Sequence, residues 1–100
     1  MSEKSSNEQV IEIEVDDVEL KFSVTRPGYN GFINKVSDKN KVAPAHNFLV
    51  MSIDEEQKES LMTILKDNPG AEIQIAGALI EEYVPDLDIV VKKRKRSPSK

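Results

Sequence analysis

Few side chains in this sequence have the chemistry of a catalytic or metal site, and their spacing is unfavourable. His46 is the only histidine, and the chain contains no cysteine. Thiolate metal ligands and a cysteine nucleophile are therefore excluded, and His46 has no evident partner for general-base catalysis. A structural hydrogen bond or a helix cap is the commoner role for such a histidine. We expect no catalytic residue, no metal site and no cofactor.

A second group of reactive side chains surrounds Pro85. It consists of the carboxylates Glu81, Glu82, Asp86 and Asp88. Carboxylate oxygens suit hard cations, but the glycine turn and the terminal bidentate glutamate of a calcium loop are absent. Gly28 and Gly31 likewise lack the lysine and the spacing of a phosphate-binding loop. We interpret the carboxylates as a solvated helix end.

The charge of the chain is strongly asymmetric. The net charge is −4, yet the last nine residues carry six basic side chains. The basic run is formed by Lys92, Lys93, Arg94, Lys95 and Arg96, with Lys100 after it. The rest of the chain has 8 basic and 18 acidic side chains, a charge of −10. Three interpretations remain open: a tail that docks on the acidic domain, an acidic protein partner, or nucleic acid. The last is the weakest, since no aromatic residue interrupts the run to stack on bases.

Length and hydropathy bound the class of protein. One hundred residues are enough for one small domain with a single core. The polar first residues lack the apolar stretch of a signal peptide, and no segment has the roughly 20 apolar residues of a membrane span. We therefore expect a cytoplasmic protein without a membrane partner, as a monomer or a weak homo-oligomer.

The N-terminal part of the domain predicts a β-hairpin. Apolar and polar residues alternate over residues 11–15 and again over residues 18–24. A two-residue turn at Asp16 and Asp17 would pair Val15 with Val18 and place all apolar side chains of this alternation on one face. Asp-Asp is a weaker type I′ turn sequence than Asn-Gly.

Three or four helices are predicted after the hairpin. Thr25 is a candidate N-cap for a first helix, whose apolar stripe is Tyr29, Phe32, Ile33 and Val36. A short helix follows near residues 44–51, and another begins at Asp54, which with Gln57 resembles a capping box. The last helix is predicted to start at Asn68 as N-cap and to end before Pro85.

The last helix contains three consecutive small residues, Ala76, Gly77 and Ala78. The glycine lowers helix propensity, and close approach of a neighbour would explain why small residues stand together here. That neighbour is either an internal helix or the helix of a binding partner. After Pro85, the alternation of Leu87, Ile89 and Val91 allows a third strand beside the hairpin.

These elements predict an α+β fold, in which an antiparallel hairpin packs against three to four helices. We expect residues 1–8 to be disordered, residues 9–91 to form the domain, and residues 92–100 to form a basic disordered tail.

Three segments of the sequence resemble a known family. They are residues 40–50 (NKVAPAHNFLV), residues 68–71 (NPGA) and residues 75–87 (IAGALIEEYVPDL). Together they resemble the tail assembly chaperones of long-tailed bacteriophages and of prophages of gammaproteobacteria. The Asp-Asp turn departs from the glycine-containing turn usual in that family, and the basic run from Lys92 exceeds what the family shows.

The resemblance implies a non-enzymatic protein that binds the tape-measure protein and aids assembly of the tail tube around it. It implies a place in the cytoplasm of the bacterial host and absence from the mature virion. A helical client with exposed apolar faces calls for an apolar groove, to which we assign Phe48, Leu49, Met51 and Met62. The alternative is a small regulatory protein that binds nucleic acid through the basic tail.

Overall fold

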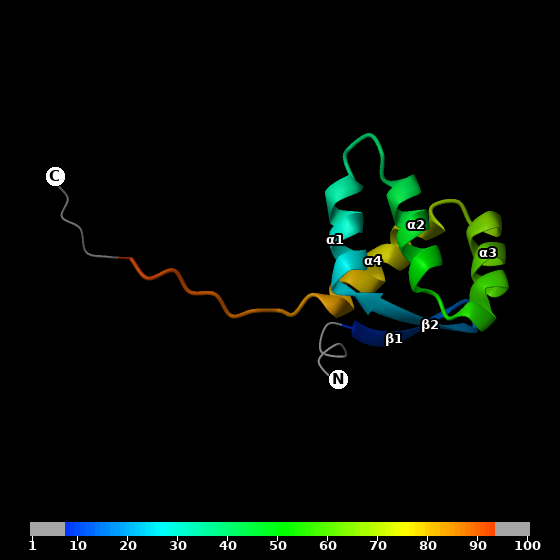
Figure 1. Cartoon of the computed structure of the whole chain (residues 1–100), viewed down its shortest axis with the longest axis horizontal. Helices are drawn as coiled ribbons and strands as arrows, with labels where there is room; N and C mark the ends of the chain where they lie inside the picture. Colours follow the sequence, from blue (N-terminus) through cyan, green and yellow to red (C-terminus); the bar gives the residue numbers. More distant parts are fainter. Residues whose placement is uncertain (1–7, 94–100) are drawn as a thin grey trace.

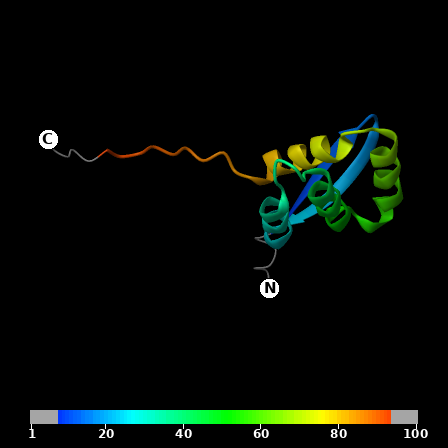
Figure 2. The same cartoon turned by 90° about the horizontal axis from the view of Figure 1, so that it is seen from above.

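The computed structural model describes residues 8–93, which form a hairpin followed by a layer of helices (Figure 1). The strands are β1 (Glu8–Val15) and β2 (Val18–Thr25). The helices are α1 (Arg26–Lys35), α2 (Val42–Ser52), the 3₁₀-helix η2 (Glu55–Gln57), α3 (Lys58–Asp67) and α4 (Ala71–Tyr83). Seen from above, α1, α2 and α3 follow one another along one side and α4 lies along the other (Figure 2). The predicted α+β class is confirmed.

The hairpin has the predicted register. Val15 pairs with Val18 and Ile13 pairs with Leu20, so the alternating apolar residues share the face that the helices cover. Asp16 and Asp17 have φ angles of 50° and 70°, the left-handed values that a type I′ turn requires at both positions. Aspartate tolerates this region better than most residues with a side chain, which explains how the turn forms without glycine.

The edge of β2 that faces away from β1 is covered by the segment between α2 and α3. Phe22 forms an isolated antiparallel bridge with Ile53, and the Asp54 N–H donates to the Lys21 carbonyl at 2.9 Å. The Gln57 side chain continues this pairing, because its Oε1 accepts from the Lys21 N–H at 2.7 Å and its Nε2 donates to a β2 carbonyl at 3.1 Å. The predicted capping box is thus wrong: the Gln57 amide completes the sheet edge instead of capping a helix.

Helix α1 begins as predicted and helix α2 is the centre of the core. The Thr25 hydroxyl accepts from the Gly28 N–H at 3.1 Å and caps α1. Helix α2 contacts α1, α4 and β2. Its Phe48 ring stacks on Phe32 of α1 with centroids 5.2 Å apart, and its Leu49 is fully buried. The largest fully buried side chains come from β2 and from three helices: Phe22, Leu20, Leu49, Leu61, Leu79 and Val24.

The link between α3 and α4 differs from the prediction. Asn68 is the C-cap of α3, where its Nδ2 donates to the Ile64 carbonyl at 2.9 Å. The N-cap of α4 is Gly70, with φ 86° and ψ −1°. The Ala71 N–H donates to the Asn68 carbonyl at 3.0 Å. Asn68, Pro69, Gly70 and Ala71 therefore form a type II turn, which needs proline-compatible geometry second and a positive φ third.

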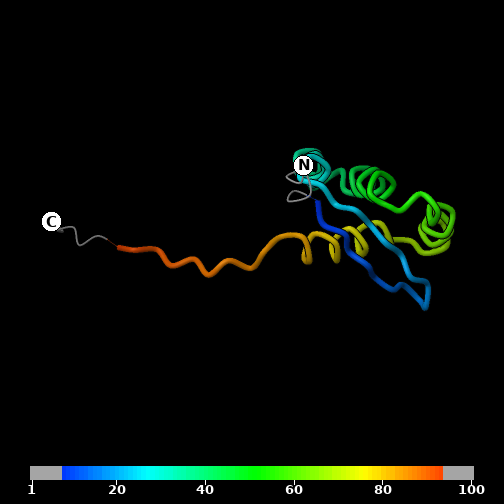
Figure 3. Tube along the Cα trace, turned by 60° about the horizontal axis from the view of Figure 1, so that its bottom comes forward, coloured from blue at the N-terminus to red at the C-terminus, as the bar shows by residue number. Residues whose placement is uncertain are grey.

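The alternating segment after α4 does not form the third strand that its sequence allows. The sheet of the described chain has only β1 and β2. Val84, which precedes Pro85, is extended (φ −84°, ψ 122°), and the chain runs away from the domain through residues 85–93 (Figure 3). Proline disfavours helical geometry in the preceding residue, so Val84 directs the chain outward instead of back to the sheet.

We predict that Gln57→Ala lowers the free energy of unfolding by about 1 kcal/mol, because both amide bonds to β2 are lost while water can partly replace them at this exposed edge. Urea denaturation followed by circular dichroism measures the loss. Gln74→Ala is the matched control, since Gln74 is exposed on α4. An equal effect of the two substitutions would show that the Gln57 contacts add nothing.

Candidate protein-binding grooves

The residues with catalytic or metal-binding chemistry do not gather into a site. Nδ1 of His46 lies 4.0 Å from Oε2 of Glu72, a contact between α2 and α4 that is too long for a hydrogen bond. Within residues 8–93 there is no group of three or more histidine, cysteine, aspartate or glutamate side chains placed to hold a metal ion. In the same residues, no helix has the length and apolar character to cross a bilayer. The surfaces with functional potential are instead apolar grooves.

The four residues assigned from sequence to a partner site are divided by the structure. Phe48 and Leu49 are core residues, exposed by 2% and 0%. The reason is that α2 is covered by neighbours on several sides, so its most apolar residues point inward. Met51 and Met62 are exposed by 69% and 41% and can contact a partner directly. Leu49 can affect a partner only through the shape of the core.

Two of these residues meet in a groove between α1 and α2. The groove has a volume of about 220 Å³, and Phe48 and Met51 both line it. Helix α1 contributes Gly28, Gly31 and Phe32. Met62 lies on α3 and lines neither this groove nor the next one. Sequence therefore identified one side of this groove but not the contribution of α1.

A larger groove lies between α1 and α4, and we call it the α1–α4 groove. Its volume is about 400 Å³. Its lining consists of Phe32, Val36, Lys41, Ile73, Ala76, Gly77, Ile80 and Glu81. Only Lys41 and Glu81 are charged, so the groove offers an apolar surface with one cation and one anion among its lining residues. Ile73 is 39% exposed and so adds accessible apolar surface to this groove.

The small residues of α4 explain the depth of this groove. Ala76 is 1% exposed and belongs to the core, as the internal-neighbour interpretation requires. Gly77 is exposed, and a Cβ atom built on it would meet no atom within 4 Å. No internal helix therefore approaches Gly77, and its missing side chain leaves the groove open. The three-residue pattern in the sequence signalled this groove, but could not show which small residue faces solvent.

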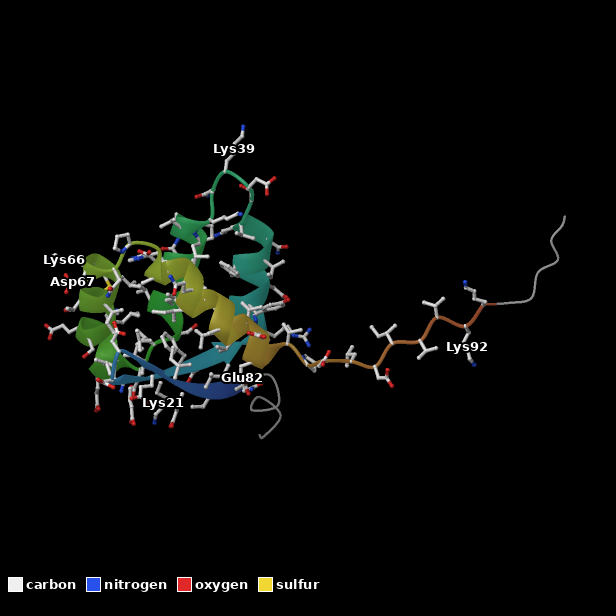
Figure 4. The ribbon with its side chains drawn as sticks, turned by 180° about the vertical axis from the view of Figure 1, so that it is seen from behind. Lys21, Lys39, Lys66, Asp67, Glu82 and Lys92 are labelled. Carbon is white, nitrogen blue, oxygen red and sulfur yellow. The ribbon has the colours of Figure 1, made fainter. Side chains whose placement is uncertain are left out.

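The basic run is only partly within the described chain. Lys92 and Lys93 are exposed, and Lys92 lies far from the helices on the extended segment (Figure 4). Arg94, Lys95 and Arg96 lie outside the described residues. In the structure, neither described lysine lines any of the grooves.

Comparison with known proteins defines the class of this small α+β protein. The family model for "Phage tail assembly chaperone" matches residues 11–93. The chain therefore belongs to the phage tail assembly chaperone family, as the resemblance of its sequence indicated.

One similar protein comes from a phage, and one solved structure shares the fold. An "uncharacterized 11.3 kDa protein in lys 3′ region" of Haemophilus phage HP1 (strain HP1c1) is 30% identical over 82 residues, which cover 82% of this chain and 79% of the relative. A solved structure of an uncharacterised protein from Bacillus stearothermophilus superposes with a TM-score of 0.63 at 25% identity. That match covers 89% of this chain and 95% of the other.

We predict that Gly77→Ala raises the free energy of unfolding by about 1 kcal/mol, because alanine favours the helix and its methyl group meets open space. Thermal or urea denaturation measures the change. Gly70→Ala serves as the opposite control, since φ 86° at Gly70 strains any L side chain and the variant should lose stability. A destabilised Gly77→Ala variant would mean that the groove is closed in solution.

Proposed function

We propose that this chain binds an amphipathic helix of the tape-measure protein in the α1–α4 groove and thereby aids assembly of the tail tube around it. It acts by covering apolar surface and carries out no catalysis. It works in the cytoplasm of the bacterial host and leaves before the virion is complete. The tail tube protein is the second partner, brought to the covered client.

The observation that supports this proposal most directly is the apolar character of a groove that is open at Gly77. A helix docks through side chains spaced three and four residues apart, which insert as a row into a groove between two helices. The α1–α4 groove has this form, with Phe32 and Val36 on one wall and Ile73 and Ile80 on the other. An unbound patch of this kind typically marks a protein-binding site.

The client's chemistry fits this surface. A long helix with apolar faces aggregates unless those faces are covered, and a chaperone must cover many similar but not identical stretches. Methionine side chains suit this task because they are flexible and polarizable. Met51 and Met62 are exposed on two further helices and would extend the contact beyond the α1–α4 groove.

The decisive variant is Gly77→Leu, because its Cβ atom meets open space and its side chain then occupies the groove. We expect the purified variant to fold and to bind a tape-measure fragment about tenfold or more weakly, which corresponds to at least about 1.4 kcal/mol. Co-expression should then leave the tape-measure protein insoluble. Titration calorimetry and the soluble fraction of the client measure the two effects.

Thr63→Leu is the matched control, because it adds a similar apolar side chain at an exposed position of α3 outside the groove. It should bind the client as the unmodified chain does. Equal binding by Gly77→Leu and the unmodified chain would refute the groove as the docking site. Phe48→Asp is unsuitable for this purpose, since a charge at a residue that is 2% exposed would unfold the domain.

A further inference from the structure

The outer edge of β1 is an unpaired strand edge. Lys21 directs its N–H and C=O away from β1, toward Gln57 and Asp54. Its cross-strand partner Glu12 must then direct its own N–H and C=O away from β2, because opposite residues of an antiparallel pair either bond each other or both point outward. The same holds for Val10 and Glu14 by the two-residue period. In the described chain no backbone bond is made by these outward groups.

A groove runs along this edge. It has a volume of about 410 Å³ and is bounded by residues 9–13 of β1 and by Ala78 and Glu82 of α4. Glu82 marks the end of α4 beside the hairpin (Figure 4). A strand added at the β1 edge would place its inward side chains next to Ile11 and Ile13 and over the small Ala78. The edge therefore offers both a hydrogen-bonding template and room for apolar side chains.

The segment after α4 has the properties of the missing strand. The segment carries four large aliphatic side chains that are 65–75% exposed, Leu87, Ile89, Val90 and Val91. Asp86 and Asp88 flank Leu87, and the other three are consecutive. A run of four large aliphatic side chains in solvent is costly unless a partner covers them. The segment is long enough to match the outward positions of β1, which span residues 10–14.

The segment is directed away from its own domain. Val84 is extended before Pro85, and the chain leaves α4 in line with the helix instead of reversing (Figures 1 and 3). Pairing with its own β1 would require a tight reversal at Val84 and Pro85, where proline disfavours helical turn geometry in the preceding residue. Pairing with the β1 edge of another copy requires no change at this joint.

We propose that residues 87–91 of one copy add as a strand to the outer edge of β1 in a second copy. With Leu87, Ile89 and Val91 facing inward, Lys92 shares the outer face with Glu12 and Glu14. A parallel register places Val90 opposite Glu12 and Lys92 opposite Glu14, so residues 87–92 lie beside residues 9–14 of β1. An antiparallel register with Lys92 opposite Glu12 would instead leave residues 87–88 beside the turn at Asp16 and Asp17. The parallel register joins opposite charges and removes apolar surface from water.

Single cysteines test this pairing cleanly, because the chain contains none. Full-length Glu12→Cys protein is mixed with full-length Val90→Cys or Lys92→Cys protein under mild oxidation. We expect a disulfide-linked heterodimer with Val90→Cys and a lower yield with Lys92→Cys, because the parallel register places Val90 opposite Glu12 and Lys92 opposite Glu14. Asn34→Cys, exposed on α1, replaces Glu12→Cys as the control. Heterodimer yields no higher than in the control would overturn the proposal.

A second measurement uses the direction of the Glu12 N–H. Glu12→Pro removes an outward donor and no bond to β2, so the hairpin remains while the edge can no longer pair fully. Sedimentation velocity should show concentration-dependent association of the unmodified chain, weakened about tenfold or more in Glu12→Pro but retained in Glu12→Thr. An unmodified chain that stays monomeric at high concentration would refute pairing between copies. So would a disulfide that forms only within one chain that carries both cysteines. Client binding through the α1–α4 groove is tested separately by Gly77→Leu, so either proposal can fail alone.

Discussion

The burial of α2 between α1, α4 and β2 constrains the rest of this structure. An isolated two-stranded hairpin is marginal in water, so its apolar face must be covered by helices. Helix α2 supplies much of this cover through Phe48 and Leu49, both almost fully buried. Because α2 directs Phe48 and Leu49 into the core, much of the apolar surface open to partners lies on the flanking helices α1 and α4. That division explains why a small domain can have both a closed core and open apolar grooves.

Helix α4 illustrates how neighbouring residues serve different surfaces. Ala76 packs in the core, Gly77 faces the α1–α4 groove, and Ala78 borders the groove along the β1 edge. A helix advances about 100° per residue, so three consecutive positions reach three directions. Large side chains at Gly77 and Ala78 would fill the two grooves. Gly77 lowers the intrinsic helix propensity of α4, and the packing of the buried residues of this helix offsets the loss.

A protein that exposes apolar side chains faces a conflict with its own solubility. This chain carries exposed aliphatic residues in the α1–α4 groove and in the segment after α4, together with an acidic domain. Carboxylates around the strand edge, among them Glu12 and Glu14, protect it from indiscriminate pairing through charge. A complementary segment with a lysine at its end is admitted more readily than a neutral one. Electrostatics would then select among apolar partners that burial alone does not distinguish.

The sequence by itself determined the local features of this protein. The hairpin register follows from period-two alternation, the turn from Asp16 and Asp17, and the start of α1 from the hydroxyl of Thr25. Each depends on residues close along the chain, where backbone geometry and short-range hydrogen bonds decide the outcome. The family resemblance was likewise carried by short segments.

Only the tertiary structure decided which apolar residues are core and which remain open. Phe48 and Met51 are near neighbours on α2, yet one is 2% and the other 69% exposed. The Gln57 side-chain amide accepts a hydrogen bond from Lys21 of β2, 36 residues earlier in the chain, which no helix-cap pattern could reveal. Asn68 caps the end of α3, and Gly70 takes the N-cap position of α4 that the sequence had predicted for Asn68. The physical reason is common to all three cases. Burial and long-range pairing depend on how the elements pack, and the periodicity of one element contains no information about its neighbours in space.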